Sequence, residues 1–303
     1  MRIILIISAL FMMGCQSTPY RDDYAKHTNQ LRGNYIQSEQ YLFTFATGEE
    51  IDLRGVYSSN TDTAATPMMY HGGAGLVGLA LQVGIHSAMV QSGREDKLSK
   101  QQQQANESIS AAINASKSFS LTDIAGEHTS DIAEGDFALE SVIHIKPIFF
   151  GQTDHSKLSL KTLVWIEWPE ELRKKKNRLK HAYRYSNLIH VHSNLLSEEQ
   201  RQQFQNGDSD ALKQQLQSML QTSLDIAKAE LTGQYKDVQG ASKTFFLKES
   251  DNKKVIRGVL VEETCNHQVI KNLRQWFVVL PKEEASNLSN ECVIAKAERN
   301  SAS

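Results

Sequence analysis

A long amphipathic segment between residues 208 and 233 constrains the fold of this chain more than any other sequence feature. Asp208 and Ser209 are residue types that begin helices, and Gly233 is a residue type that follows their ends. The apolar residues between them recur at helical spacing: Leu212, Leu216, Met219, Leu220, Leu224, Ala227 and Leu231. Gln and Lys occupy the other side, so we predict a helix that packs one apolar stripe on a sheet.

Segments rich in β-branched and aromatic residues precede this helix and would supply the strands of that sheet. The strongest are residues 137–150, 158–168 and 184–191. Residues 41–45 and 51–57 alternate apolar and polar side chains around Gly48, which predicts a β-hairpin with Gly48 in its turn. A Gln-rich segment from about residue 95 to residue 118 has apolar residues at helical spacing, so we predict a further helix there.

The pattern changes after Gly240 to shorter strand-like segments. They cover residues 244–248, 254–262, 267–273 and 275–280. Turn residues separate them at Asp251-Asn252 and at Cys265-Asn266. Short strands at this spacing predict a compact meander or a small barrel that forms a module of its own.

Together these segments predict an α+β fold. Its main part is a mostly antiparallel sheet packed by two or three helices, and its C-terminal part is a small all-β meander or barrel. The predicted organisation is a signal peptide over residues 1–14, a flexible tether over 15–40, an α+β domain over 41–236, a small β module over 240–282 and a loose tail over 283–303.

The first residues of the chain have the character of an export signal. Arg2 supplies a positive charge, and residues 3–13 form an apolar run that is too short to span a bilayer. Residues 12–15, Met-Met-Gly-Cys, resemble the lipobox of bacterial lipoproteins. This resemblance implies cleavage before Cys15 and acylation of its thiol, and Gln16 in the next position implies delivery to the outer membrane. We expect the mature protein to be anchored by lipid on the periplasmic face of that membrane.

The body of the chain resembles a group of uncharacterised bacterial envelope lipoproteins. The resemblance rests on the Gly-rich stretch Gly72–Gly78, the strand-like segment Tyr183–Ile189, the amphipathic helix that follows it, and the segment Arg257–Glu263. It covers most of the mature chain. It implies an envelope location and no particular activity.

Gly73, Gly75 and Gly78 match the spacing of a dinucleotide-binding fingerprint. That fingerprint needs a strand before it and an acidic residue at the end of the next strand, and neither pattern surrounds these glycines. We therefore expect no cofactor. The nearly apolar segment 68–90 instead favours a Gly-rich helix that packs closely on another surface, and insertion into a membrane is the alternative.

His190 and His192 are two residues apart on a predicted strand, so both imidazoles should point to the same face. His144 and Glu167 belong to neighbouring predicted strands, and the four side chains together could form a metal site. Surface histidines on a half-exposed sheet are the alternative. The chain has no nucleophile elbow, zinc-protease motif or Walker loop, so we assign no catalytic residue.

The charge balance of 33 basic against 35 acidic residues argues against nucleic acid as a partner. The most basic segment contains Arg173, Lys174, Lys175, Lys176 and Arg178. Such a run is typical of a solvated loop between two strands. Attraction to an anionic lipid or to an acidic protein surface is the alternative.

Cys265 and Cys292 are the cysteines that remain when Cys15 is acylated. An oxidising periplasm allows a disulfide between them, which would tie the C-terminal tail to the β module. Two free thiols are the alternative, because the separation of the two Cα atoms does not follow from the sequence.

These observations lead us to expect a membrane-anchored periplasmic lipoprotein that acts as a non-enzymatic interaction or assembly subunit of the cell envelope. Its partners would be the membrane, through the N-terminal lipid anchor, and an envelope protein. The alternative is a periplasmic ligand- or metal-binding protein, or a hydrolase, that uses the sheet face carrying His144, Glu167, His190 and His192.

Overall fold

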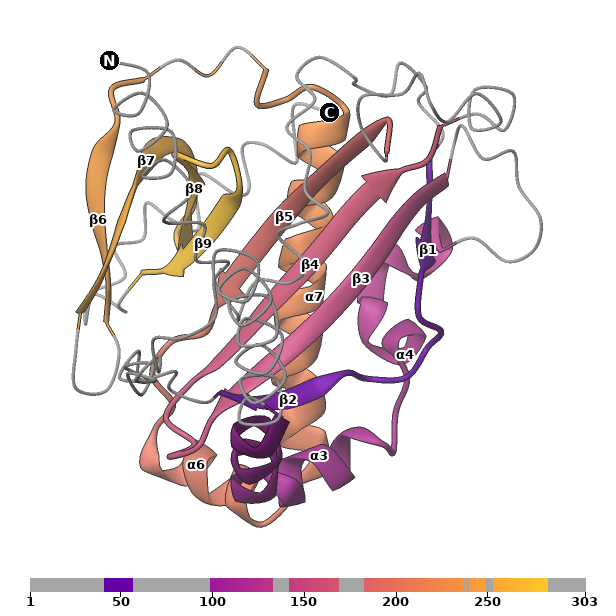
Figure 1. The fold of residues 1–303 in the computed structure, drawn as a ribbon, viewed down its shortest axis with the longest axis vertical. Coiled ribbons are helices and arrows are strands. Elements are labelled where there is room, and N and C mark those ends of the chain that lie inside the picture. The colour runs from indigo at the N-terminus through magenta and orange to yellow at the C-terminus, as the bar shows by residue number, and fades with distance from the viewer. Residues whose placement is uncertain are drawn as a thin grey trace, which may run out of the picture.

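The fold combines one mixed β-sheet with helices packed on it (Figure 1). The computed structural model describes residues 41–56, 99–132, 142–168, 183–236, 238, 240–248 and 253–282. Within these residues the predicted α+β class is confirmed.

Three long strands form the centre of the sheet. They are β3 (Val142–Gln152), β4 (Leu158–Ile166) and β5 (Tyr185–His192). β3 pairs antiparallel with β4, and β4 pairs antiparallel with β5. All three were predicted from their β-branched and aromatic residues, with boundaries that differ by a few residues.

The C-terminal strands extend the same sheet beyond β5. They are β6 (Lys243–Lys248), β7 (Lys253–Glu263), β8 (His267–Asn272) and β9 (Phe277–Pro281). Each pairs antiparallel with the next, which confirms the predicted meander, and β9 runs parallel to β5. The strand order β1-β3-β4-β5-β9-β8-β7-β6 has two ends, so the sheet is not closed into the barrel that was the alternative.

The predicted hairpin between residues 41 and 57 is wrong. β1 (Leu42–Phe45) and β2 (Leu53–Val56) form, and Gly48 turns the chain with a φ of 81°, but the two strands do not pair with each other. Both lie parallel to β3, one after the other along its edge. A two-stranded hairpin this short is marginally stable, whereas the long edge of β3 offers hydrogen bonds and burial to both strands.

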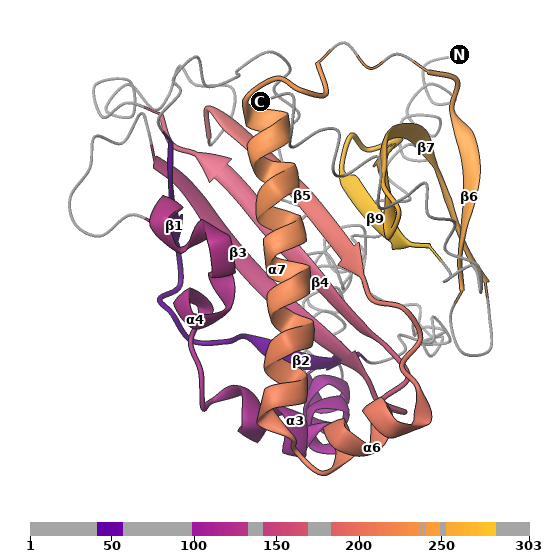
Figure 2. The ribbon, with the colours of Figure 1, turned by 180° about the vertical axis from the view of Figure 1, so that it is seen from behind.

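The predicted long helix is α7 (Ser209–Leu231), which crosses β3, β4 and β5 on one face of the sheet (Figure 2). The Asp208 carboxylate accepts hydrogen bonds from the backbone N–H groups of Asp210 and Ala211, so Asp208 is the N-cap. Every apolar residue of the predicted stripe is buried. The main core lies between this stripe and the sheet, with Phe43, Phe149 and Phe277 fully buried in it.

Shorter helices complete the α7 face and the end of the sheet near β2. They are residues 99–108, α3 (Ser110–Ser116), α4 (Leu121–Ala125), the 3₁₀ helix η3 (Gly126–Asp131) and α6 (Glu198–Gln205). Residues 99–108 and α3 confirm the Gln-rich helix, which a turn at Ile109 divides. Residues 99–108 pack so tightly that a Cβ on Gly55 would lie 2.2 Å from the Ala105 carbonyl oxygen. A side chain at position 55 would therefore push this helix away from β2.

Two polar contacts join the meander to the end of α7. The ammonium group of Lys271 on β8 lies 3.1 Å from the carboxylate of Glu230, which is 6% exposed. Tyr235, which follows α7, donates a hydrogen bond to Glu262 on β7. The meander also has a core of its own on the face away from α7: Leu247, Ile256, Ile270, Val278 and Leu280.

Among the described residues, no helix is both long and apolar enough to cross a membrane.

Candidate functional site

The face of the sheet opposite α7 has a mixed composition. Ile143, Ile145 and Phe149 of β3 belong to the α7-side core, so the even-numbered residues His144, Lys146 and Ile148 point to the opposite face. The register of β3, β4 and β5 aligns four rows there: His144–Trp165–Ser186, Lys146–Leu163–Leu188, Ile148–Lys161–His190 and Phe150–Ser159–His192. Each row contains an imidazole, an ammonium group or a hydroxyl beside apolar side chains.

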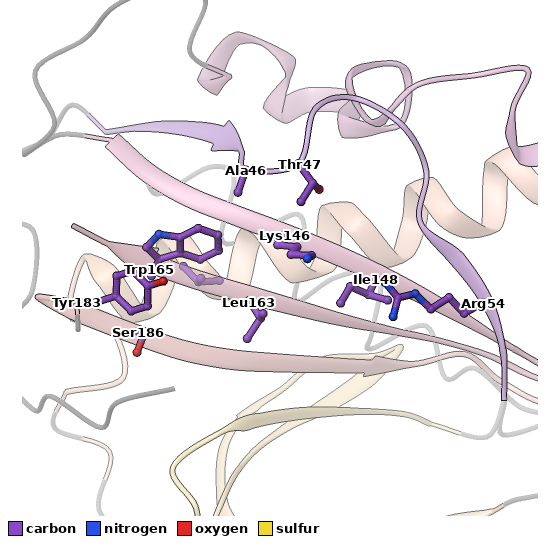
Figure 3. A pocket seen from close by; sticks show the side chains of 10 residues that line it. Ala46, Thr47, Arg54, Lys146, Ile148, Leu163, Trp165, Tyr183 and Ser186 are labelled. Atoms are coloured by element: carbon purple, nitrogen blue, oxygen red, sulfur yellow. The ribbon is translucent and has the colours of Figure 1, made fainter. Parts of the chain in front are cut away.

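A cleft of about 440 Å³ lies over the first rows of this face (Figure 3). Its walls come from the β1–β2 connection, from β2, from β3 and β4, and from the start of β5. The lining residues are Ala46, Thr47, Arg54, Lys146, Ile148, Leu163, Val164, Trp165, Tyr183 and Ser186. Cavities that bind small molecules have volumes in this range and combine an apolar lining with a few polar groups.

An aromatic row forms one end of the cleft. The rings of His144 and Trp165 stack with centroids 5.4 Å apart and an interplanar angle of 15°. The ring of Tyr183 lies 5.7 Å from that of Trp165, at 43°. Trp165 and Tyr183 of this row line the cleft and give this end of it an aromatic, apolar wall.

Two cations line the cleft beside this aromatic row. Arg54 forms a two-point ion pair with Asp52, with nitrogen–oxygen distances of 2.7 and 2.6 Å, which fixes the direction of its guanidinium. Lys146 lies between Ile148 and the aromatic row, directly across from Leu163. Because Asp52 balances the charge of Arg54, Lys146 supplies the net positive charge beside the apolar floor of the cleft.

His190 and His192 lie next to the cleft on β5, and their ring centroids are 3.9 Å apart. Burial lowers the pKa of both imidazoles well below the ordinary value, and the nearby charges of Lys157, Lys161 and Lys254 lower them further. Both rings are therefore neutral at pH 7. The Nε2 atom of His190 is buried and has no hydrogen-bond partner among the described residues.

The four residues predicted as metal ligands do not meet at one point. His144 is opposite Trp165 and His190 is opposite Lys161, so they lie four residues apart along β4, or about 13 Å. Glu167 follows the end of β4. The structure brings together only His190 and His192, and the lysines around them oppose the binding of a cation.

A second cluster, which sequence reasoning missed, lies on the α7 side. His128 of η3 is 3% exposed; its Nδ1 lies 3.0 Å from Asp131 and its Nε2 lies 3.0 Å from Asp225 of α7. Asp225 and then Asp131 raise the pKa of His128 against the opposing effect of burial. His128 and Asp225 are 97 positions apart, so no local spacing in the sequence connects them.

The remaining predicted site residues fall largely outside the described stretches. These are the lipidation residue Cys15, the glycines Gly73, Gly75 and Gly78, the basic residues Arg173, Lys174, Lys175, Lys176 and Arg178, and Cys292. Cys265 is in the turn before β8 and forms a disulfide. Its partner lies outside the described residues, so the pairing with Cys292 stays a prediction.

Comparisons with known proteins found no relative of this chain. Neither a protein-family model, nor a curated protein, nor a solved structure matches the chain. The site is therefore interpreted from its own geometry and chemistry.

Proposed function

We propose that this chain is a lipid-anchored protein of the bacterial cell envelope that binds an anionic ligand in the cleft opposite α7, without catalysing a reaction. Acylated Cys15 would hold it on the periplasmic face of the outer membrane, in line with the lipobox-like residues 12–15. The observation that carries the binding function is the cleft itself. Its lining combines apolar and aromatic side chains with the cationic side chains of Arg54 and Lys146.

The ligand class follows from these groups. A flat ring would pack against the wall formed by Trp165 and Tyr183, and a negatively charged group would meet the ammonium group of Lys146, with Arg54 as an additional hydrogen-bond donor. Arg54 is already oriented by Asp52, so less conformational freedom is lost on binding. The ligand therefore carries an aromatic or sugar ring and a carboxylate, sulfonate or phosphate group.

A fluorescent aromatic sulfonate, anilinonaphthalene sulfonate, is a probe with both features. We expect the folded, purified full-length protein to bind this probe. The substitutions Lys146→Gln and Trp165→Leu should each weaken its binding at least about tenfold. Lys117→Gln, an exposed lysine at the end of α3 on the α7 side of the sheet, is the matched control and should leave affinity unchanged. Equal affinity in all three variants would reject the cleft as the binding site, provided circular dichroism shows that each is folded.

The proposed anchor has a separate test. Mass spectrometry of the mature N-terminus should find an acylated cysteine at position 15, and the protein should fractionate with the outer membrane. Cys15→Ala should prevent acylation and cleavage at this position. An unmodified N-terminus on the wild-type protein would contradict the anchor and leave the proposed cleft function open to its own test.

An interaction or assembly subunit is the second candidate function, and the edge of the meander favours it. Phe246 on β6 and Val255 on β7 are cross-strand partners, and they are 63% and 56% exposed. They lie on the hairpin of β6 and β7, and within the described residues β6 is the last strand of the sheet, with one edge that no described strand pairs.

A photo-crosslinking residue at position 246 tests this candidate in intact cells. We expect it to form one defined adduct with an envelope protein, and Val255→Ser to reduce the yield of that adduct. The same crosslinker at position 100 is the control. No adduct at position 246, or the same adducts at both positions, would reject an interface at this edge.

A further inference from the structure

Three side chains that can bind metals converge between η3 and α7, on the side of the sheet away from the cleft. One ring nitrogen of His128 and one carboxylate oxygen each from Glu127 and Asp225 lie within 4.8 Å of one another. His128 Nε2 and Asp225 Oδ1 are only 3.0 Å apart.

The separation between His128 and Asp225 is close to that between two ligands of one transition-metal ion. Zinc binds imidazole nitrogen and carboxylate oxygen at about 2.0–2.2 Å, so ligand atoms on one tetrahedral ion lie roughly 3.3 Å apart. His128 and Asp225 already satisfy this spacing approximately. Glu127 is exposed, so its side chain can make the remaining adjustment without disturbing the core.

The surroundings of His128 hold its ring in the orientation that a ligand needs. Its Nδ1 lies 3.0 Å from Asp131, whose carboxylate is 3.9 Å from the ammonium group of Lys228. The ring of Phe43 meets it edge-on, with centroids 6.3 Å apart. Histidines that bind metals usually donate their second ring N–H to a carboxylate in this way, which leaves Nε2 free to act as the ligand.

A salt bridge alone accounts for only part of this arrangement. A protonated imidazole has two N–H donors, and here Asp131 and Asp225 already face both nitrogens. The ring has no third donor for Glu127, whose carboxylate converges on the same point. A divalent ion in place of the Nε2 proton would have three ligands and would carry one more positive charge than that proton.

We propose that Glu127, His128 and Asp225 bind one divalent transition-metal ion, with Asp131 as the positioning residue for His128. One imidazole nitrogen and two carboxylates suit Zn²⁺, with Mn²⁺ and Fe²⁺ as related choices. Asp225 has a side chain that is 58% exposed, so the ion reaches the site from solvent and keeps a position for water. Bound metal would link η3 to the middle of α7.

Zn²⁺ titration of the full-length, chelator-treated protein by calorimetry tests this proposal. We expect one equivalent to bind, and Glu127→Gln to weaken the affinity at least about tenfold. Glu107→Gln, an exposed glutamate on the helical segment 99–108, is the matched control and should bind like the wild type. Because Glu127 is exposed, its variant should fold normally, so a loss of affinity there cannot be ascribed to unfolding.

Co²⁺ supplies a readout that a purely structural role would not change. Its visible absorption reports ligand number and type, and we expect the spectrum to change in Glu127→Gln and in Asp131→Asn, with about a 10- to 100-fold loss of affinity in Asp131→Asn. Absence of stoichiometric Zn²⁺ binding overturns the proposal. Binding that is equally tight in Glu127→Gln and His128→Gln also overturns it, because the ion then belongs to another site.

Discussion

The two faces of the central sheet are built from the same three strands but differ in chemistry. On the α7 face, Ile143, Ile145 and Phe149 of β3 are fully buried against the helix. On the opposite face, His144, Lys146 and Phe150 are only partly buried, although Ile148 between them is buried, and Lys146 and Ile148 line the cleft. Because successive residues of a strand point to opposite faces, one strand can contribute to stability on one side and to ligand binding on the other.

The histidines show how strongly the two faces differ in their electrostatics. Carboxylates raise the pKa of His128 on the α7 side, whereas burial and nearby lysines lower the pKa of His190 and His192 on the opposite side. The first environment favours a cation and the second disfavours one. Carboxylates therefore dominate the charge around His128 on the α7 side, and lysines dominate the charge around the β5 histidines on the cleft side.

The largest expected effect is on the α7 face. Leu220 is a fully buried residue on the sheet-facing side of α7. Leu220→Ala should lower the free energy of unfolding by about 2–5 kcal/mol, because apolar burial is lost and a cavity is left. Urea unfolding followed by circular dichroism measures the change. If Leu220→Ala is as stable as the wild type, the packing of α7 on this face is not what stabilises the fold.

A buried hydrogen bond on the same face gives the next effect. The Ser223 hydroxyl donates to the Thr162 hydroxyl over 2.7 Å, and both residues are fully buried. Ser223→Ala should cost about 1–3 kcal/mol, because it leaves the Thr162 hydroxyl without this partner. Adding Thr162→Val removes both polar groups, so the double variant should recover part of the loss. A double variant whose loss equals the sum of the two single losses would show that the hydroxyls are not coupled.

The third expected effect is a pH-dependent change in stability, and it comes from His190 and His192 on the cleft face of the sheet. Since the folded pKa values of His190 and His192 lie below the unfolded value of about 6.5, the unfolded chain binds more protons as the pH falls. Their contribution to stability is therefore present above that value and is lost as the pH falls toward the folded pKa values. Urea unfolding at about pH 7.5 and at about pH 5.5 should show a smaller loss in a His190→Gln/His192→Gln variant than in the wild type.

His155→Asn is the control for this comparison. Burial also lowers the pKa of His155, but less than for the β5 pair, and Asn tolerates its positive φ of 58°. We expect this variant to lose nearly as much stability on acidification as the wild type. Equal losses in the wild type and the double variant would mean that the β5 histidines do not contribute to acid sensitivity.

The smallest expected effect on stability comes from the cations of the cleft. Lys146→Gln should change the free energy of unfolding by about 0.5 kcal/mol or less, because the side chain is partly exposed and its change leaves no cavity. The same variant should weaken binding of the anionic probe. A large loss of stability would show that Lys146 supports the fold. The cleft face would then contribute to stability at this position, as the α7 face does.

Local patterns predicted the elements of the fold well where the periodicity is long. The apolar stripe from Leu212 to Leu231 identified α7 and its buried face, and Asp208 is its N-cap as expected. The helices α4 and α6 were missed because each is short, although the capping-box pairs Ser120–Asp123 and Ser197–Gln200 were readable signals. The hairpin prediction failed because two neighbouring strands were assumed to pair with each other rather than with β3.

The candidate sites were less predictable than the elements. The pair His190 and His192 was recognised because a strand places alternate residues on one face. The cleft was not, because Arg54, Lys146 and Tyr183 come from three separate segments that meet only when β2 pairs with β3 and β5 joins the sheet through β4. The His128 cluster was missed for the same reason.

The sequence by itself determined which segments form the long strands and α7, and which residues of α7 face inward, because these depend on neighbours a few positions away. Only the tertiary structure decided that β1 and β2 both pair with β3, that the meander joins the sheet through β5 and β9, and that Asp225 faces His128. Strand partners and cluster members are chosen by burial and hydrogen bonding between distant segments. Such contacts between distant segments leave no periodic pattern in the sequence.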